Sequence, residues 1–317
     1  MLPERGPLTE RLQGAGAEVI THPLAILRRG DVLGPLRAIR RDRRELAAVA
    51  DGAALVHSNT SVVLSGQALG RPSLIHVREI WPRPPVLWPL MRRRLLRADA
   101  LACISQPVLE QFAGSPKARL LADGLARMPQ PPGRQEARER LGLPADAFVA
   151  AYIGRLSAWK GQDVFAEAIA QLDGAVGVVA GDEVPGSDHS AGLDRQAAEL
   201  GIDDRLIRLG FVDDVDVLLG AADAVVVPSK RPEPLGQVAL EAAAAGVPLV
   251  ATSAGGLADF VREAKAGALV PPGDAPAVAT ALRAIAEGSV EVGGLPERFS
   301  SERMAAELQD LYDELAG

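Results

Sequence analysis

The fold of this chain is decided by the stretch EPLGQVALEAAAAGVPLVAT at residues 233–252. The pattern predicts a loop at Pro-Leu-Gly, an alanine-rich helix, a tight turn at Gly-Val-Pro and an apolar strand. Small residues at the helix start leave backbone N–H groups and the positive end of the helix dipole open to a phosphate. Glu233 precedes these N–H groups, and Glu241 lies about two turns into the helix. Because both carboxylates can accept hydrogen bonds from hydroxyl groups, the stretch favours a nucleotide-sugar, which carries a sugar, a pyrophosphate and a ribose in a row.

Short apolar runs alternate with amphipathic stretches along the whole sequence. The strands that we predict are 18–21, 54–57, 73–77, 100–104, 118–121, 148–153, 176–180, 207–210, 224–228, 249–252 and 268–270. The helices that we predict are 162–172, 190–200, 215–221, 235–245, 275–287 and 299–315. Several strands are apolar on both faces, as strands of a buried parallel sheet are. The alternation predicts an α/β fold of two Rossmann-like, doubly wound domains.

The sequence predicts four segments along the 317 residues, a length at which two domains are the natural expectation. Residues 1–125 form a first domain, and residues 126–140 form a linker that is rich in proline. Residues 141–297 form a second domain, and residues 298–317 form a C-terminal helix able to pack back on the first. Ligands of such sheets bind near the carboxyl ends of the strands, so we expect the site in the cleft between the domains.

Charge is distributed unevenly along the chain. Residues 1–140 carry 22 Lys and Arg against 13 Asp and Glu, whereas residues 141–317 carry 12 against 28. The basic first half indicates contact with an anionic substrate or membrane surface, and the alternative is a set of solvated helix faces. Aromatic residues make up 3% of the chain and are almost absent from the basic clusters at 28–29, 37–44 and 92–97. This scarcity argues against a nucleic-acid partner, because single-stranded bases are bound by stacking on aromatic rings.

The composition also limits the compartment and the class of enzyme. The single cysteine, Cys103, fits a reducing compartment and excludes an internal disulfide. The first residues do not resemble a secretory signal, and no apolar run reaches the roughly 20 residues that span a bilayer. We therefore expect a cytoplasmic protein, able to lie peripherally on the inner face of the membrane. The motifs of serine hydrolases, zinc proteases and P-loop enzymes do not occur in the sequence, so these classes lack support.

A second informative stretch, GRLSAWKG at residues 154–161, directly follows the predicted strand 148–153. Gly154 allows the backbone to turn sharply after the strand. Arg155 and Lys160 then lie at the carboxyl end of the strand, where two cations can neutralise a pyrophosphate. The alternative is a pair of solvated surface cations, but the stretch at 233–252 favours the phosphate interpretation.

Two further pairs of residues, one of aspartates and one of glycines, come after predicted strands. Asp214 and Asp216 have a spacing that some sugar-transfer enzymes use to hold a divalent metal, but they are better placed to cap and begin a helix. Gly255 and Gly256 follow the strand 249–252 and allow a ligand to approach the main chain closely, with a plain tight turn as the alternative.

Four more positions are candidates for contacts with a ligand. His57 and His76 end predicted strands of the first domain, where a histidine either contacts a substrate hydroxyl or is structural. Main-chain groups near Phe211 and Val212 follow the strand 207–210 and can read the edge of a base.

Taken together, these segments resemble the retaining glycosyltransferases of the two-Rossmann-domain (GT-B) architecture, and most closely the large family 4, also called group 1. The resemblance is carried by GRLSAWKG at 154–161, GFV at 210–212, the stretch 233–252, GG at 255–256 and LVPPGD at 269–274. It is specific over residues 145–285. It is looser over residues 1–125, where GPL at 6–8, HSNT at 57–60 and IS at 104–105 are similar to the acceptor domain of the family.

The resemblance implies a role for each site residue. Arg155 and Lys160 bind the donor diphosphate together with main-chain N–H groups near Leu235, Glu233 contacts the donor sugar, and Glu241 holds the ribose hydroxyls. The implied catalytic residues are Glu233, Lys160, Arg155 and His76. The implied donor-binding residues are Gly154, Arg155, Lys160, Phe211, Val212, Glu233, Pro234, Leu235, Gly236 and Glu241. Neither a metal nor a cofactor is expected, because the cations and the helix start replace the metal and the nucleotide-diphosphate sugar is a co-substrate.

The chain departs from the family pattern at two places. Family members usually begin with a strand, a Gly-rich loop and a helix before they reach a segment like GPL at 6–8, so we expect a first domain that lacks this opening unit and is incomplete. The family often has His-Asp after the strand that corresponds to 73–77. This chain has Arg78-Glu79 there, with His76 two positions before Arg78, so either His76 or Arg78 contacts the sugar.

We therefore predict a retaining glycosyltransferase that moves a sugar from a nucleotide-diphosphate sugar to a hydroxyl of a glycolipid, a polysaccharide or a small glycoside. No carboxylate is clearly placed as the nucleophile of a double displacement, which favours a same-face route in which the leaving phosphate helps to take the acceptor proton. The alternatives are a nucleotide-sugar-binding protein with impaired catalysis and a nucleotide-sugar epimerase on the same fold. The expected partners are the donor, a sugar, lipid or polysaccharide acceptor and an anionic membrane surface, and no nucleic acid.

Overall fold

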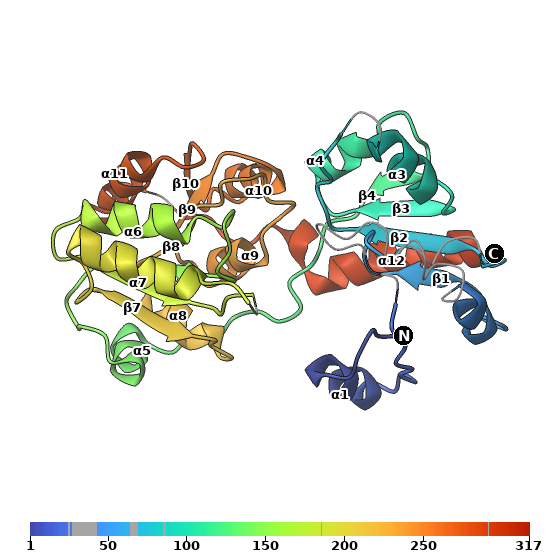
Figure 1. Cartoon of the computed structure of the whole chain (residues 1–317), viewed down its shortest axis with the longest axis horizontal. Coiled ribbons are helices and arrows are strands. Elements are labelled where there is room, and N and C mark those ends of the chain that lie inside the picture. The colour runs from blue at the N-terminus through green and yellow to red at the C-terminus, as the bar shows by residue number, and fades with distance from the viewer. Residues whose placement is uncertain (25, 27–42, 64–68, 85–86, 185, 291) are drawn as a thin grey trace. The chain divides into compact units, whose positions relative to one another are not determined.

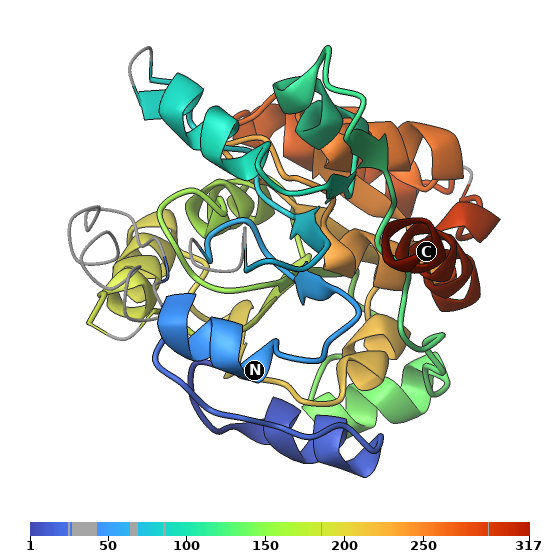
Figure 2. The ribbon, with the colours of Figure 1, turned by 90° about the vertical axis from the view of Figure 1, so that its right-hand side faces the viewer.

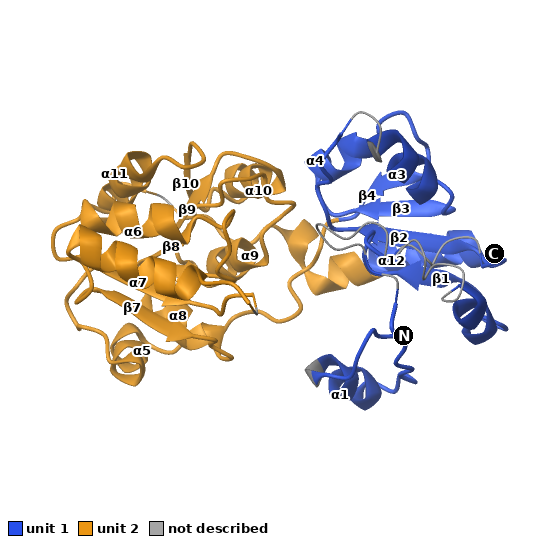
Figure 3. Cartoon of the chain, viewed as in Figure 1, with its two compact units in different colours: residues 1–121, 306–317 blue, residues 122–305 orange. Residues whose placement is uncertain are grey.

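The computed structural model describes residues 1–317 apart from 25, 27–42, 64–68, 85–86, 185 and 291. The described residues form two compact units, which are Met1–Leu121 with Ala306–Gly317, and Ala122–Ala305 (Figure 3). Each unit contains one parallel sheet, so the predicted α/β fold with two Rossmann-like domains is confirmed. The predicted basic clusters at 28–29 and 37–42 lie outside the described residues.

The second unit is built on a six-stranded parallel sheet (Figure 1). Its strands are β5 (Val149–Ile153), β6 (Val176–Ala180), β7 (Leu206–Gly210), β8 (Ala224–Val227), β9 (Leu249–Thr252) and β10 (Gly267–Val270), in the order β10-β9-β8-β5-β6-β7. Its helices are α5 (Arg134–Leu141), α6 (Gln162–Ala170), α7 (His189–Leu200), α8 (Val215–Ala221), α9 (Gln237–Ala244), α10 (Gly256–Ala264) and α11 (Ala275–Ala286), with a short 3-10 helix η2 (Glu297–Phe299). The strand order runs outward from the centre in both directions, so right-handed connections place α6 and α7 on one face and α9 and α10 on the other. In agreement, α6 packs against α7 and α11, and α9 packs against α10.

The burial of the strands in the core of this unit explains why their sequences are continuous apolar runs. Strands β6, β8 and β9 are buried at every position. Phe165 and Ile169 of α6 and Val278 and Leu282 of α11 pack in one fully buried cluster. Full burial of a side chain of this size stabilises the fold by roughly 1.5–3 kcal/mol. This core holds the carboxyl ends of the strands, and the loops that follow them, in a fixed arrangement.

The first unit contains a four-stranded parallel sheet in the order β1-β2-β3-β4. Its strands are β1 (Val56–Ser58), β2 (Ser73–Val77), β3 (Ala100–Cys103) and β4 (Ala118–Leu120). Its helices are α1 (Pro7–Gly14), a helix at 43–49, α3 (Leu87–Leu95), α4 (Gln106–Leu109) and the 3-10 helix η1 (Glu110–Phe112). The predicted strand at 18–21 is wrong, because within it only Thr21 makes a bridge, to Leu2. Glu18 is exposed and Val19 is only half-buried, so this stretch has no apolar face to bury against a sheet.

A single C-terminal helix, α12 (Ser301–Ala316), begins in the second unit and ends in the first (Figure 3), and the C-terminus of the chain follows it (Figure 2). Its last turns contact the first sheet through two polar interactions. A hydrogen bond of 2.7 Å joins the Tyr312 hydroxyl to His57 Nδ1. The Arg119 guanidinium forms two bonds of 2.5 Å to the Glu314 carboxylate. None of the described helices is long and apolar enough to cross a membrane.

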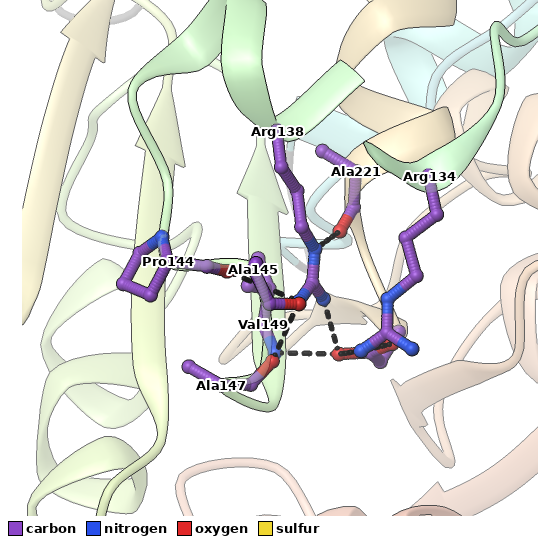
Figure 4. A network of polar contacts seen from close by, with 8 residues as sticks. Arg134, Arg138, Pro144, Ala145, Ala147, Val149 and Ala221 are labelled. Carbon is purple, nitrogen blue, oxygen red and sulfur yellow. Dashed lines mark hydrogen bonds and ion pairs between the residues drawn. The ribbon is translucent and has the colours of Figure 1, made fainter. Parts of the chain in front are cut away.

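Part of the segment that we expected to be a linker is the helix α5, which packs against α8. Its Arg138 is 1% exposed and donates to Ala221 O at 3.1 Å and to Asp223 Oδ2 at 2.7 Å (Figure 4). Arg138 Nη1 also lies 2.6–3.2 Å from the carbonyl oxygens of Pro144, Ala145 and Ala147. Asp223 accepts the Val149 N–H at 2.7 Å. The network therefore ties α5 to the amino ends of β5 and β8, opposite the edge where the loops carry the site residues.

Candidate functional site

The two stretches that the sequence singles out meet after the neighbouring strands β5 and β8. Lys160 Nζ lies 2.5 Å from Glu233 Oε1. The Ser229 hydroxyl donates to the same carboxylate oxygen at 2.6 Å. Glu233 is 4% exposed, so a cation and a hydroxyl hold this buried carboxylate in one position. Sequence reasoning missed Ser229, although its place directly after the predicted strand 224–228 is a usable signal.

The loop that carries Lys160 is fixed to the loop after β8. The Lys230 N–H donates to Trp159 O at 2.7 Å, and Lys160 Nζ lies 4.5 Å from the centre of the Trp159 ring. Gly161 has a φ of 76°, and a Cβ at this position would collide with the carbonyl oxygen of Pro228. Glycine is required there both by the left-handed conformation and by the close approach of the two loops.

Gly255, the first of the paired glycines after β9, contacts the main chain of Glu233. Gly255 forms a bridge with Glu233, and a Cβ at Gly255 would collide with the Glu233 carbonyl oxygen. The close approach that we expected for a ligand is therefore made, at Gly255, by the main chain of Glu233. This contact explains how the buried carboxylate is supported from the neighbouring strand.

The helix after Glu233 begins close to the predicted place. Gly236 is the N-cap residue of α9 and has a φ of 95°, which a glycine adopts readily. Leu235 before it is buried, with 4% exposed. The first N–H groups of a helix have no acceptor within the helix, so the start of α9 can donate to an anion beside Glu233.

Glu241, in the second turn of α9, lies near a charged pair that the sequence did not predict. Arg127 Nη1 lies 2.7 Å from Asp216 Oδ2, and the Gln130 N–H donates to the same oxygen at 2.9 Å. Burial raises the pKa of Glu241, the charge of Asp216 raises it further, and the charge of Arg127 opposes both. Asp214 is the N-cap residue of α8 but makes no capping hydrogen bond with its side chain. Asp214 thus occupies the expected N-cap position without making the expected hydrogen bond. Asp216 connects the segment 127–130 to α8 through its contacts with Arg127 and Gln130.

The loops after β5, β6 and β7 are joined at the same edge of the sheet. The Gly154 N–H donates to Ala180 O at 2.9 Å, and the Gly181 N–H donates to Gly210 O at 2.7 Å. A Cβ at Gly181 would collide with the Gly154 carbonyl oxygen. Gly154 and the residues after Gly210 therefore lie on the edge that carries Lys160.

Arg155 and Phe211 present exposed side chains on this edge. Phe211 is 70% exposed, and Val212 beside it is half-buried. The carbonyl of Arg155 accepts the Tyr152 hydroxyl at 3.1 Å, which fixes the main chain there. Burial raises the pKa of Tyr152, and the charges of Glu233 and Asp163 raise it further, so this hydroxyl stays a hydrogen-bond donor.

His76 is buried within the sheet of the first unit. It is 0% exposed within β2, and its ring stacks on that of His57 with 5.8 Å between the ring centres. Burial first, and the charge of Arg78 second, lower the pKa of His57 to about 4 and that of His76 to about 3. The expectation that His76 acts on the sugar stays a prediction, and in this structure its ring has no exposed surface. The neutral rings instead support the packing of Tyr312 against the first sheet.

Glu79 organises the loops after β1 and β2, a role that the sequence did not predict. Its carboxylate accepts the Thr60 hydroxyl at 2.5 Å, the Ser61 N–H at 3.2 Å and the Ser61 hydroxyl. The buried amide of Gln111 donates to Glu79 O at 3.0 Å and accepts the Trp81 N–H at 2.7 Å. Three successive strand ends of the first sheet are thus held together. The polar run at 58–61 directly after a predicted strand was the available signal.

The chemistry that the second unit offers is that of an anion site beside a fixed carboxylate. Lys160 and the start of α9 supply positive charge and N–H donors, and Glu233 supplies a hydrogen-bond acceptor, while the exposed Arg155 follows β5 on the same edge of the sheet. Within the part of the chain that the structure describes, no group of three or more His, Cys, Asp or Glu is placed to hold a metal ion. The arrangement can bind a phosphate and a hydroxyl group of one ligand.

Comparisons with known proteins identify the family of this chain. Residues 133–303 match the family Glycosyl transferases group 1. The D-inositol 3-phosphate glycosyltransferase of Nocardioides sp. is 34% identical over 207 residues, which cover 58% of this chain and 45% of that enzyme. The enzyme of the same name from Thermomonospora curvata is 39% identical over 166 residues, which cover 48% of this chain and 38% of that enzyme. The chain thus spans less than half the length of these relatives.

Solved structures match over a larger share of the chain. HepE of Anabaena in complex with UDP-glucose has a TM-score of 0.82 and 25% identity, and the match covers 98% of this chain and 90% of HepE. The sucrose-phosphate synthase of Thermosynechococcus elongatus has a TM-score of 0.76 and 24% identity, with 93% and 80% covered, and shares the fold.

Proposed function

The chain belongs to the group 1 glycosyl transferases, and on this premise we propose that it transfers a sugar from a nucleotide-diphosphate sugar to an acceptor hydroxyl with retention of configuration. The observation that carries the proposal is the contact of 2.5 Å between Lys160 Nζ and Glu233 Oε1 beside the start of α9. A diphosphate bound by Lys160 and these N–H groups brings the attached sugar next to the Glu233 carboxylate. The complex of HepE with UDP-glucose supports a donor of this class.

The proposed reaction needs a site that stabilises a leaving diphosphate and an electron-poor sugar carbon. Lys160, Arg155 and the N–H groups at the start of α9 bind the negative charge that grows on the diphosphate, in place of a metal ion. Glu233 accepts hydrogen bonds from the sugar and orients its ring. The acceptor attacks from the face that the diphosphate leaves, and a phosphate oxygen takes the proton of the acceptor hydroxyl.

The nucleoside of the donor is proposed to lie along the same edge. Glu241 is half-buried and accepts hydrogen bonds from the ribose hydroxyls. Main-chain groups at Phe211 and Val212, after β7, contact the edge of the base. Gly154, Pro234 and Gly236 shape the loops around the diphosphate.

The acceptor that we propose is a lipid-linked sugar or a growing polysaccharide at an anionic membrane surface. Support comes from α3, where Leu90 is 63% exposed and Arg93 is exposed. Arg92 of the same helix makes a contact within the first unit, since its side chain donates to Gln111 O at 3.2 Å. Sedimentation with vesicles of anionic lipid at low salt should capture the protein, and an equal affinity for neutral vesicles would reject this part of the proposal.

The experiment that tests the reaction is an assay of purified protein with a panel of nucleotide-diphosphate sugars and acceptor extracts. We expect release of the nucleoside diphosphate that depends on the acceptor, and a product whose anomeric configuration equals that of the donor. Lys160→Ala and Glu233→Ala should abolish transfer while the circular dichroism spectrum stays unchanged. Binding of a donor without turnover would favour a binding protein, and an epimerised donor sugar would favour an epimerase.

A further inference from the structure

The ion pair at the centre of the site sets a condition on any anion that binds there. The contacts to the Glu233 carboxylate from the described residues, Lys160 Nζ at 2.5 Å and Ser229 Oγ at 2.6 Å, both use Oε1. A diphosphate that approaches Lys160 therefore comes within a few ångströms of a negative charge. This charge is 4% exposed, so water and salt screen it weakly.

A diphosphate with a sugar and a diphosphate without one meet this carboxylate differently. The hydroxyl groups of a sugar can donate to Oε2, and hydrogen bonds to an ionised acceptor are the stronger ones. A bare diphosphate lacks these sugar hydroxyl groups, so it meets the repulsion of the carboxylate without the hydrogen bonds that offset it. The lysine alone would bind both diphosphates, whereas the carboxylate beside it favours the one that carries a sugar.

We propose that Glu233 is a specificity residue that lowers the affinity of the site for a bare nucleoside diphosphate and so favours the sugar-bearing form. This inference rests on the proposed function, in which Lys160 binds the diphosphate and Glu233 the sugar. Once the sugar is transferred, the nucleoside diphosphate loses the hydroxyl groups that offset the repulsion. Glu233 thereby promotes release of this product as well as selection of the donor.

The test is calorimetric binding of UDP, ADP, GDP, inorganic pyrophosphate, UDP-glucose, ADP-glucose and GDP-glucose to the full chain and to Glu233→Gln. The glutamine keeps the size of the side chain and removes its charge. We expect the bare diphosphates to bind about tenfold more tightly to the variant, because one unit charge beside the phosphates is removed. The matching sugar conjugate should bind no more tightly than to the unmutated protein.

A matched control is offered by the neighbouring ion pair of Lys230 with Asp163, whose side chains are 37% and 38% exposed. Asp163→Asn removes the same charge from a solvated pair, so it should change the affinity for bare diphosphates by less than about twofold. Thermal unfolding of each variant shows whether it is folded.

Three results decide the matter. If the unmutated protein binds a nucleoside diphosphate and Glu233→Gln binds it no more tightly, the inference is overturned and the proposed function stands. Equal tightening by Asp163→Asn would also overturn it, because the effect would then follow from net charge alone. If no nucleoside diphosphate and no sugar conjugate binds the unmutated protein, the proposed function fails, and the inference fails with it.

Discussion

Replacement of Arg138 by methionine tests how the second unit is held together. Methionine is similar in length to the methylene part of the arginine side chain but has no guanidinium. The guanidinium that is lost belongs to a residue that is 1% exposed, and it donates to Asp223 and to backbone carbonyl groups (Figure 4). Loss of one partner of a buried ion pair costs about 3–5 kcal/mol. Arg134 Nη2 remains 3.0 Å from Asp223 Oδ1 and the Val149 N–H remains bonded, so we expect the lower end of that range. A loss of about 3 kcal/mol lowers the midpoint of thermal unfolding of a unit of this size by roughly 6–12 °C.

The assay is urea unfolding followed by far-ultraviolet circular dichroism, together with a thermal scan. Arg134→Met is the matched control, because it removes a contact to the same carboxylate from a side chain that is 56% exposed, and it should cost at most about 1 kcal/mol. Affinity for the donor at 20 °C should not change, since the network lies at the amino ends of the strands. Equal destabilisation by the two variants would refute the reasoning that burial makes Arg138 the important partner.

Three further predictions concern the two units separately. Glu79→Ala should destabilise the first unit by about 2–3 kcal/mol in urea unfolding, since it leaves the hydroxyl groups of Thr60 and Ser61 and the Ser61 N–H without this acceptor. Glu79→Gln should lose less stability, and an equal loss in the two variants would contradict the role of the Glu79 carboxylate. Burial and the charge of Arg78 hold the pKa of His57 at about 4 and that of His76 at about 3, both below the unfolded value of about 6.5. The unfolded chain therefore binds more protons in this window, and stability that is complete above pH 6.5 should fall by about 1.4 kcal/mol per pH unit for each ring as the pH drops toward 4. Urea midpoints at pH 7 and pH 5 measure this, and equal midpoints would contradict the burial of the rings. Gly255→Ala should push the main chain of Glu233 away from Lys160 and lower the turnover number about tenfold or more, and full activity would show that the bridge does not position this carboxylate.

The strands were predictable where burial on both faces leaves a continuous apolar run, as in β6, β8 and β9. The stretch 18–21 shows the limit of this reasoning. Its residue types favour a strand, but a strand also needs a neighbouring strand to pair with. Within 18–21 only Thr21 forms a bridge, and its partner is Leu2. Pairing is a tertiary property that local sequence does not contain.

The same limit separates the parts of the site that could be predicted from those that could not. Lys160 and Glu233 each come after a predicted strand of a parallel sheet, so their place at one edge of that sheet could be predicted, whereas the adjacency of β5 and β8 is seen only in the structure. The bond between His57 and Tyr312 joins residues 255 positions apart, and no spacing rule connects them. The burial of His76 could not be predicted for a related reason, because its place within the apolar strand β2, and not the chemistry of its side chain, decides that it is buried.

The central claim is that Lys160 and Glu233 together hold the diphosphate and the sugar of one ligand. The most direct test is a crystal structure of the protein with a bound nucleotide-diphosphate sugar. We expect a phosphate oxygen at about 2.7–3.2 Å from Lys160 Nζ and a sugar hydroxyl at a similar distance from the Glu233 carboxylate. A donor bound elsewhere, with the ion pair of these two residues out of its reach, would contradict the account.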